Sequence, residues 1–333
     1  MKYMFAIAGL MIGLSGPAMA SPVTDVFTSY YAFGDSLSDD GKLGALYPPS
    51  LDGRFSNGRV WTEYVADAFA AAGRDTGNLA LGGATAGDVN LQPLAPLSTF
   101  KGQINTFLYS MANGFGLPTK LAPVPQYAAT PPNPGANPLV SVMFGANDIF
   151  QGFSPVAAAH AVTENIRYLA TATGGVFNDF LLAGLPDLGK TPAFMGSADA
   201  TLAALAFNLT LAGDVLGLRA EGLNIIGFDT DAVFQDILDD VKAGGIKYGI
   251  LDATTPCTAS LSQPGPSCVG QIDPNLLFFS DGVHPNGKVH EIVGDRVLAV
   301  LEDSVTPVPV PASLPLLLAG LAGLGLAARR RAA

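Results

Sequence analysis

One of the three histidines in this sequence has the neighbour that a general base needs. A serine hydroxyl is a poor nucleophile until a base accepts its proton and a third group fixes the tautomer of that base. Asp281-Gly282-Val283-His284 places a carboxylate three residues before the imidazole, on a glycine-containing turn. His160 and His290 have no acid obviously placed to orient them. We therefore expect His284 to be the base and Asp281 to orient it, although this pattern alone is weakly specific.

The candidate nucleophile is Ser36, which ends Gly34-Asp35-Ser36, a tight turn after a β-prone run. Residues 78–83 (Asn-Leu-Ala-Leu-Gly-Gly) and 145–148 (Gly-Ala-Asn-Asp) supply donors for the negative oxygen of a tetrahedral intermediate. Glycine lets a backbone N–H approach the substrate closely, and asparagine donates without titrating. Each block alone is a common turn or strand end. The four blocks follow one another along the chain, at 34–36, 78–83, 145–148 and 281–284. Their occurrence together in this order predicts catalysis.

Together, the four blocks resemble those of the GDSL family of SGNH hydrolases. Residues 53–61 and 185–189 are similar to secondary signatures of its secreted esterases, so the resemblance runs from about residue 31 to residue 301. It implies an ester hydrolase that forms an acyl-enzyme on Ser36, with Asp281 and His284 completing a catalytic triad. The implied oxyanion hole consists of the N–H groups of Ser36 and Gly83 and the side-chain amide of Asn147. We expect no metal and no cofactor.

Three neighbouring residues have other expected roles. Gly82 is the alternative to Gly83 as a donor, although the spacing from Asn78 favours Gly83. We expect Asp35 to hold its turn rather than to react, and Asp148 to orient Asn147 or its loop.

Other chemistries are disfavoured by motif and by charge. An α/β-hydrolase would require a G-x-S-x-G sequence, and a zinc hydrolase would require an H-E-x-x-H motif. Neither is present. Residues 282–289 nearly spell a phosphate-binding loop, but Val289 stands where a serine or threonine would hold magnesium. The formal net charge of -11, without a cluster of lysine and arginine in the body, argues against nucleic acid as a partner.

Hydrophobic patterning predicts alternating strands and helices. The strands are expected at 30–33, 78–81, 139–144, 176–183 and 223–228. The helices are expected at 61–72, 157–171, 198–221, 234–243 and 289–301. The proline-rich stretch 118–138 indicates a loop that could contribute to a lid. We predict one domain at 24–303, a flavodoxin-like three-layer α/β/α sandwich whose central parallel sheet binds ligands at the carboxyl ends of its strands.

Both ends of the sequence are predicted to be processing segments. Residues 1–20 have a positive start, an apolar stretch and the Ala-x-Ala ending of a signal peptide that signal peptidase removes. Residues 304–333 combine Val-Pro-Val-Pro-Ala, an apolar run and three arginines, an order that resembles PEP-CTERM sorting tails. An exosortase-type membrane enzyme would cleave such a tail, and a plain transmembrane anchor is the alternative. The protein is then exported to the periplasm, the outer surface or the extracellular matrix.

Cys257 and Cys268, the two cysteines of the chain, are expected to form a disulfide, because an even count in an exported protein favours pairing. Two thiols without a nearby histidine offer too few ligands for a metal.

Three functions remain open from the sequence. The first is hydrolysis of an ester of a lipid, an acylglycerol or an acylated polysaccharide. The second is acyl transfer from the same acyl-enzyme to an alcohol instead of water. The third is a non-catalytic surface or matrix protein that keeps the fold.

Overall fold

Five parallel strands form the central sheet of the computed structural model, which describes residues 22–94 and 96–305. The order across the sheet is β2-β1-β5-β6-β7. The strands are β1 (Ser29–Gly34), β2 (Asp75–Asn78), β5 (Pro138–Met143), β6 (Asp179–Ala183) and β7 (Asn224–Phe228). This is a doubly wound order that reverses between β1 and β5, and ligands of such sheets bind outside the carboxyl ends at that point.

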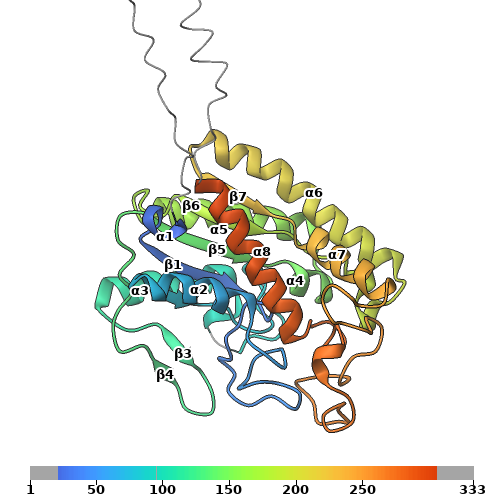
Figure 1. Ribbon diagram of the computed structural model, residues 1–333. Helices are drawn as coiled ribbons and strands as arrows, with labels where there is room; N and C mark the ends of the chain where they lie inside the picture. The colour runs from blue at the N-terminus through green and yellow to red at the C-terminus, as the bar shows by residue number, and fades with distance from the viewer. Residues whose placement is uncertain (1–21, 95, 306–333) are drawn as a thin grey trace, which may run out of the picture.

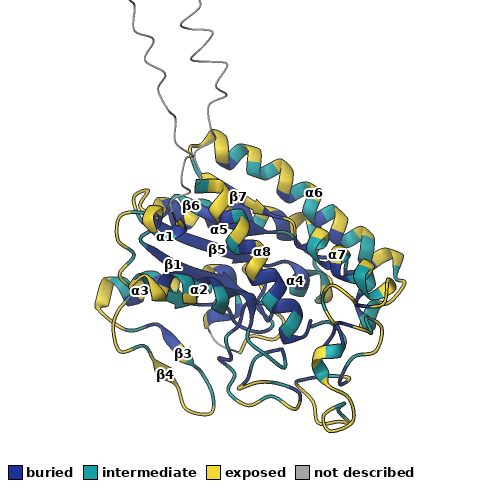
Figure 2. Ribbon diagram, in the orientation of Figure 1, coloured by how far each residue is buried: buried dark blue, intermediate teal, exposed yellow. Residues whose placement is uncertain are grey.

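The middle strand β5 and its neighbour β1 are buried over their whole lengths (Figure 2). They pair in parallel from Ser29 opposite Pro138 to Gly34 opposite Met143. Continuous apolar strands of this kind are expected where helices cover both faces of a sheet.

Helices cover both faces, which confirms the predicted three-layer fold (Figure 1). One face packs against α3 (Phe100–Asn113), α5 (Pro155–Ala172) and α6 (Ala198–Ala220). The other packs against α1 (Val23–Val26), α2 (Trp61–Ala71), α7 (Thr230–Lys242) and α8 (Gly287–Val305). The side chains of β1 alternate between the two cores, with Tyr31 and Phe33 in the first and Tyr30 and Ala32 in the second.

Helix α6 is the one helix among the described residues that is long and apolar enough to cross a membrane by length and composition. It packs along α5, and its buried side chains include Ala204, Phe207 and Leu211. Its mean hydropathy reaches 1.5 over a window that is only 22% buried.

Several predicted boundaries need correction. The strand expected at 78–81 is β2 at Asp75–Asn78; beyond it, the N–H of Leu79 still donates to Ala32 O, outside regular pairing. Strand β6 begins at Asp179 rather than at 176. Helix α7 begins earlier than predicted, at Thr230, because the Asp229 side chain accepts a hydrogen bond from the N–H of Ala232.

Helix α3, a two-stranded hairpin and the short helices at 23–26 and 146–150 were not predicted. Helix α3 begins after Thr99, whose hydroxyl accepts from the N–H of Gly102, and it ends at Gly114 with a φ of 71°. The stretch expected to be a loop at 118–138 contains a two-stranded hairpin, β3 (Pro118–Lys120) with β4 (Gln126–Tyr127). The short helix α4 (Ala146–Phe150) and 3-10 turns complete the described part. The predicted signal peptide, residues 1–20, and all but residues 304–305 of the predicted tail lie outside it.

Candidate active site

Ser36, His284 and Asp281 form a connected chain of hydrogen bonds at the carboxyl end of β1. The Oγ of Ser36 lies 2.8 Å from Nε2 of His284, and Nδ1 of His284 lies 2.8 Å from Oδ1 of Asp281. Ser36 is 7% exposed, and the side chains of His284 and Asp281 are 13% and 8% exposed. The nearly dry setting strengthens these contacts. This arrangement allows proton transfer from a serine hydroxyl to an imidazole that a carboxylate orients.

The turn that carries Ser36 is held by Asp35. Its Oδ1 accepts a hydrogen bond from the N–H of Leu37, and its carbonyl accepts from the N–H of Ser38. Burial raises the pKa of Asp35 to about 7, although the hydrogen bond from Leu37 and the nearby His284 oppose the shift. Its contacts fit the turn-holding role expected from the sequence.

Asp281 is held as a carboxylate by its own loop. Its Oδ1 also accepts hydrogen bonds from the N–H groups of Val283 and His284. Burial alone would raise the pKa of Asp281, but the charge and hydrogen bonds of His284 and the N–H of Val283 outweigh it and lower the pKa to about 2. The acid three residues before the base thus folds back onto it.

Residues 78–83, here called the glycine block, begin at the last residue of β2 and reach the same edge of the sheet. The N–H of Gly82 donates to Oδ2 of Asp39 at 2.8 Å, so this donor is engaged inside the protein. Gly83 adopts a φ of 81°, and a Cβ added there would meet nothing within 4 Å. The left-handed conformation favours glycine, and the open space beside Gly83 suits a close approach by a substrate.

Asn147 follows β5 and lies in the same cleft as Ser36. Its side-chain amide donates to the carbonyl of Ala84 at 3.0 Å, and its second N–H is left for another acceptor. The neighbouring Asp148 accepts from the N–H groups of Ala86 and Gly87. Asp148 therefore ties the 145–148 block to the residues after Gly83.

Asp39 joins the serine turn to the glycine block, a role that the sequence alone did not indicate. Its Oδ1 accepts from the N–H groups of Gly41 and Lys42, while its Oδ2 takes the N–H of Gly82. Burial raises the pKa of Asp39, which the charge of the buried Lys42 opposes. The one sequence signal for this role was that Asp39 stands three residues after Ser36.

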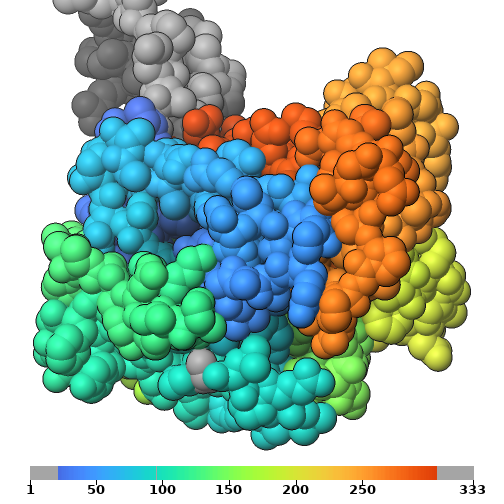
Figure 3. All heavy atoms as spheres, turned by 90° about the horizontal axis from the view of Figure 1, so that it is seen from below, coloured from blue at the N-terminus to red at the C-terminus, as the bar shows by residue number. Residues whose placement is uncertain are grey.

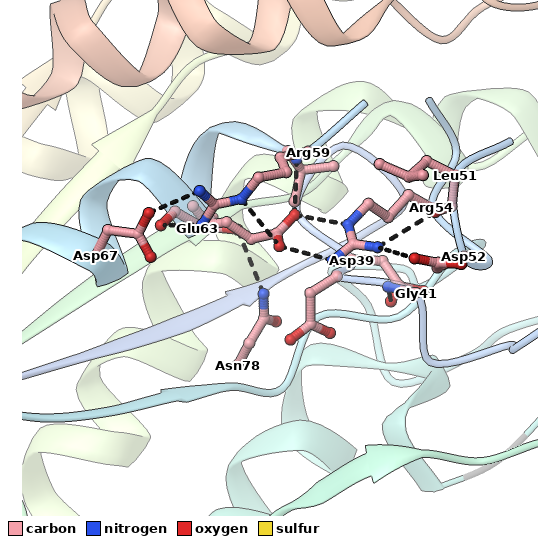
Figure 4. A network of polar contacts seen from close by, with 12 residues as sticks. Asp39, Gly41, Leu51, Asp52, Arg54, Arg59, Glu63, Asp67 and Asn78 are labelled. Atoms are coloured by element: carbon pink, nitrogen blue, oxygen red, sulfur yellow. Dashed lines mark hydrogen bonds and ion pairs between the residues drawn. The ribbon is translucent and has the colours of Figure 1, made fainter. Parts of the chain in front are cut away.

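The secondary signature at 53–61 braces the start of α2 through ion pairs (Figure 4). Arg54 makes two hydrogen bonds to Glu63, at 2.8 and 2.7 Å, and Arg59 pairs with Asp67 at 2.6 Å. Glu63 also accepts from the N–H of Val60 at the beginning of the helix. Two-point arginine–carboxylate contacts fix orientation as well as distance.

The same signature contacts the segment that carries the base. The Oδ1 of Asn57 accepts from the N–H of Gly287, and a Cβ on Gly58 would stand 2.8 Å from the Cα of Gly287. The ring of Phe55 lies 4.8 Å from that of His284. Blue and orange segments, distant in sequence, adjoin on this face in Figure 3, in agreement with the hydrogen bond from Asn57 to Asn275.

Cys257 and Cys268 are joined by a disulfide. The N–H groups of Cys257 and Thr258 donate to the carbonyls of Phe279 and Ser280, and the N–H of Leu261 donates to Oδ2 of Asp281 at 3.3 Å. The disulfide loop therefore lies directly against the segment that carries the base.

The other two histidines lie in different surroundings. His160, for which no obvious acid was found in the sequence, contacts Asp214 on α6 at 2.6 Å, a partner 54 residues away. Its side chain is 50% exposed. His290 lies inside α8, where burial lowers its pKa to about 3. Among the residues that the structure describes, no group of three or more His, Cys, Asp and Glu side chains could hold a metal.

Residues 30–297 match the family model of the GDSL-like lipases and acylhydrolases. A thermolabile hemolysin of Vibrio parahaemolyticus is 27% identical over 303 residues, which cover 82% of this chain and 64% of the hemolysin. A phosphatidylcholine-sterol acyltransferase of Aeromonas hydrophila is 28% identical over 269 residues, with 77% of this chain and 72% of that protein covered. This chain thus spans less than two thirds of the hemolysin.

Among solved structures, the inhibitor-bound aryl esterase of M. smegmatis matches 84% of this chain and 99% of its own. Its sequence is 14% identical and the TM-score is 0.46.

Proposed function

We propose that this chain, which belongs to the GDSL-like lipase/acylhydrolase family, hydrolyses carboxylic esters through an acyl-enzyme on Ser36. The observation that carries the proposal is the hydrogen-bond chain from Ser36 through His284 to Asp281. An activated hydroxyl needs both links, and a scaffold protein needs neither. The substrate classes remain an ester of a lipid, an acylglycerol or an acylated polysaccharide.

In the proposed reaction, Ser36 Oγ attacks the ester carbonyl while its proton moves to Nε2 of His284. The negative oxygen accepts hydrogen bonds from the N–H groups of Ser36 and Gly83 and from the amide of Asn147. When the carbon–oxygen bond breaks, His284 returns the proton to the leaving alcohol. Water then attacks the acyl-enzyme with His284 again as base, and the acid leaves as Ser36 regains its proton.

The decisive test compares the wild type with Ser36→Ala on p-nitrophenyl esters and with a fluorophosphonate label. The change removes one oxygen at a turn, so we expect the circular dichroism spectrum to be kept while both hydrolysis and labelling disappear. Hydrolysis by the variant at the wild-type rate would overturn the mechanism. Failure of the folded wild type to react with either probe would favour a non-catalytic protein.

Acyl transfer is a second candidate, because one relative is described as a phosphatidylcholine-sterol acyltransferase. The two reactions share the acyl-enzyme and differ in whether water or an alcohol accepts the acyl group. Product analysis in the presence of a lipid alcohol distinguishes them. New ester in excess of free acid would assign a transferase, and free acid alone would assign a hydrolase.

The same proposal includes export, with removal of residues 1–20 and cleavage near the Val-Pro-Val-Pro-Ala motif before the apolar run at 314–328. The disulfide supports export, because such bonds persist in oxidising compartments. The apolar run is shorter than the roughly 20 residues of a comfortable transmembrane helix. Mass spectrometry of protein from the native host should find both ends trimmed. Membrane-bound chains that all end at Ala333 would instead indicate a permanent anchor.

A further inference from the structure

We propose that Leu37 and Phe234 form a wall that limits the enzyme to esters with short acyl chains, such as acetyl and butyryl esters. This inference rests on the proposed ester hydrolysis at Ser36. It concerns the space beside the nucleophile, not the chemistry of the triad.

The cleft beside Ser36 is small. It measures about 70 Å³ and has Ser36, Asn147 and His284 in its lining. The rest of the lining is mostly apolar and includes Ala146, Leu188 and Val283. Pockets that bury drug-sized ligands measure about 300 to 1,000 Å³. The cleft therefore accommodates a short acyl group beside the reacting atoms, and a longer chain would have to leave it.

A second cavity lies behind this cleft, on the α2–α7–α8 side of the sheet. It measures about 10 Å³, and Met143, Ala183 and Phe228 are among its lining residues. Leu37 and Phe234 line both spaces, so their side chains separate them. Phe234 is 7% exposed and packs edge-on against Phe278, with 5.2 Å between ring centroids. The wall is thus braced from behind.

The second cavity is not wholly apolar. Its lining includes Trp61, Thr230 and His290, each with a buried nitrogen or oxygen that has no hydrogen-bond partner among the described residues. A space of about 10 Å³ suits one water molecule held by such groups. An acyl chain that enters would meet these polar atoms, so shortening the wall should give a moderate gain for longer chains.

The experiment measures kcat/KM on p-nitrophenyl acetate, butyrate and octanoate, below the concentrations at which they aggregate. For the wild type we expect butyrate to exceed octanoate by about tenfold or more, since even one methylene that finds no space in a pocket costs about tenfold. Phe234→Ala and Leu37→Ala should each raise the ratio of octanoate to butyrate by about tenfold. Ratios within one variant cancel losses that affect all substrates alike.

The matched control is Phe69→Ala, a ring truncation in the same core that stacks on Tyr30, does not contact Phe234 in any ring pair and lines neither space. It should leave the octanoate-to-butyrate ratio within about twofold of wild type, as expected for a change that touches no substrate carbon. If Phe234→Ala does not fold, Leu37→Ala, in a less buried position, carries the test.

A wild type that hydrolyses octanoate as fast as butyrate would overturn the inference while leaving ester hydrolysis intact. In that case the chain would leave the cleft over the stacked pair Phe150 and Phe194, whose ring centroids are 5.0 Å apart. An unchanged ratio in folded wall variants would overturn it as well. A wild type that is inactive on all three esters would instead refute the proposed function.

Discussion

Asp281 stays ionised at every pH at which an esterase is normally assayed. Burial alone would raise its pKa, but the charge of His284 and the hydrogen bonds from its own loop outweigh burial and lower the pKa to about 2. The carboxylate can therefore hold Nδ1–H of His284 before and after the imidazole accepts a proton. A loss of activity in mild acid would have to come from a group other than Asp281.

Asn147 offers the clearest single-residue prediction. Its amide donates to Ala84 O, and the residue lines the cleft that holds Ser36. We expect Asn147→Ala to lower kcat by about 100-fold with little change in KM, as for a donor used mainly in the transition state.

The control is Asn165→Ala, because Asn165 also donates to the segment that follows Gly83, at Ala86 O, but does not line the cleft. A matching fall in kcat for both variants would show that Asn147 acts only by supporting that segment.

Asp35 predicts a pH-dependent stability. Burial raises its pKa in the folded protein from 3.8 to about 7, so folding favours the protonated acid. The folded state therefore loses stability as the pH rises from about 4 to about 7.

Asp35→Asn removes that ionisation and can keep the hydrogen bond from Leu37. Its free energy of unfolding, relative to wild type, should rise by on the order of 2 to 4 kcal/mol between pH 4 and pH 8. Urea unfolding at both values measures the difference, and the exposed Asp303→Asn is the control. A difference that does not change with pH would contradict the raised pKa.

At the scale of elements, Asp39 couples two loops that follow neighbouring strands. Asp39→Ala leaves three buried N–H groups without their acceptor, those of Gly41, Lys42 and Gly82. We expect a loss of roughly 3 kcal/mol in stability. We also expect kcat to fall about tenfold or more, because a small displacement of an oxyanion donor is costly.

Asp40→Ala is the matched variant, since it also removes a partner of Lys42 but not the hydrogen bond to Gly82. An equal loss of kcat in both would assign the effect to Lys42.

The disulfide loop links stability to the position of the base. The two half-cystines are 11 residues apart, and the chain-entropy model gives such a bridge about 2 to 3 kcal/mol. Replacing both cysteines by serine should lower the free energy of unfolding by that amount. Because Leu261 in this loop donates to Asp281, kcat should fall as well. Unchanged midpoints in urea would contradict the stabilising role.

The elements that the sequence predicted well share one property: a long and unambiguous pattern. Strand β5 is a continuous apolar run, and α2, α5 and α6 are long segments of helix formers. Helix α3 was missed although Phe100, Ile104 and Phe107 lie on one face at helical spacing and are buried. Strand β2 was misplaced because Asp75-Thr76-Gly77-Asn78 has low β-propensity and is set by pairing with β1.

For the molecule as a whole, local motifs predicted which residues form the site, but they did not predict the contacts between residues distant in the sequence. Short sequence motifs contain the three site residues Ser36, Asn147 and His284. The fold brings these residues to one edge of the sheet. The contact between Asp39 and Gly82, and that between His160 and Asp214, depend on how strands and helices pack. No local pattern contains that information, so these partners appear only in three dimensions.

The nucleophile and its base are separated by 248 residues of chain. Their hydrogen bond closes almost the entire domain, and such distant contacts form only when the elements between them have docked. A chain still emerging from the ribosome, or threaded unfolded through a translocation channel, has the serine but not the imidazole beside it. In the proposed mechanism Ser36 is activated only once this contact has formed, so ester hydrolysis requires the finished fold, and an incompletely folded chain cannot carry it out.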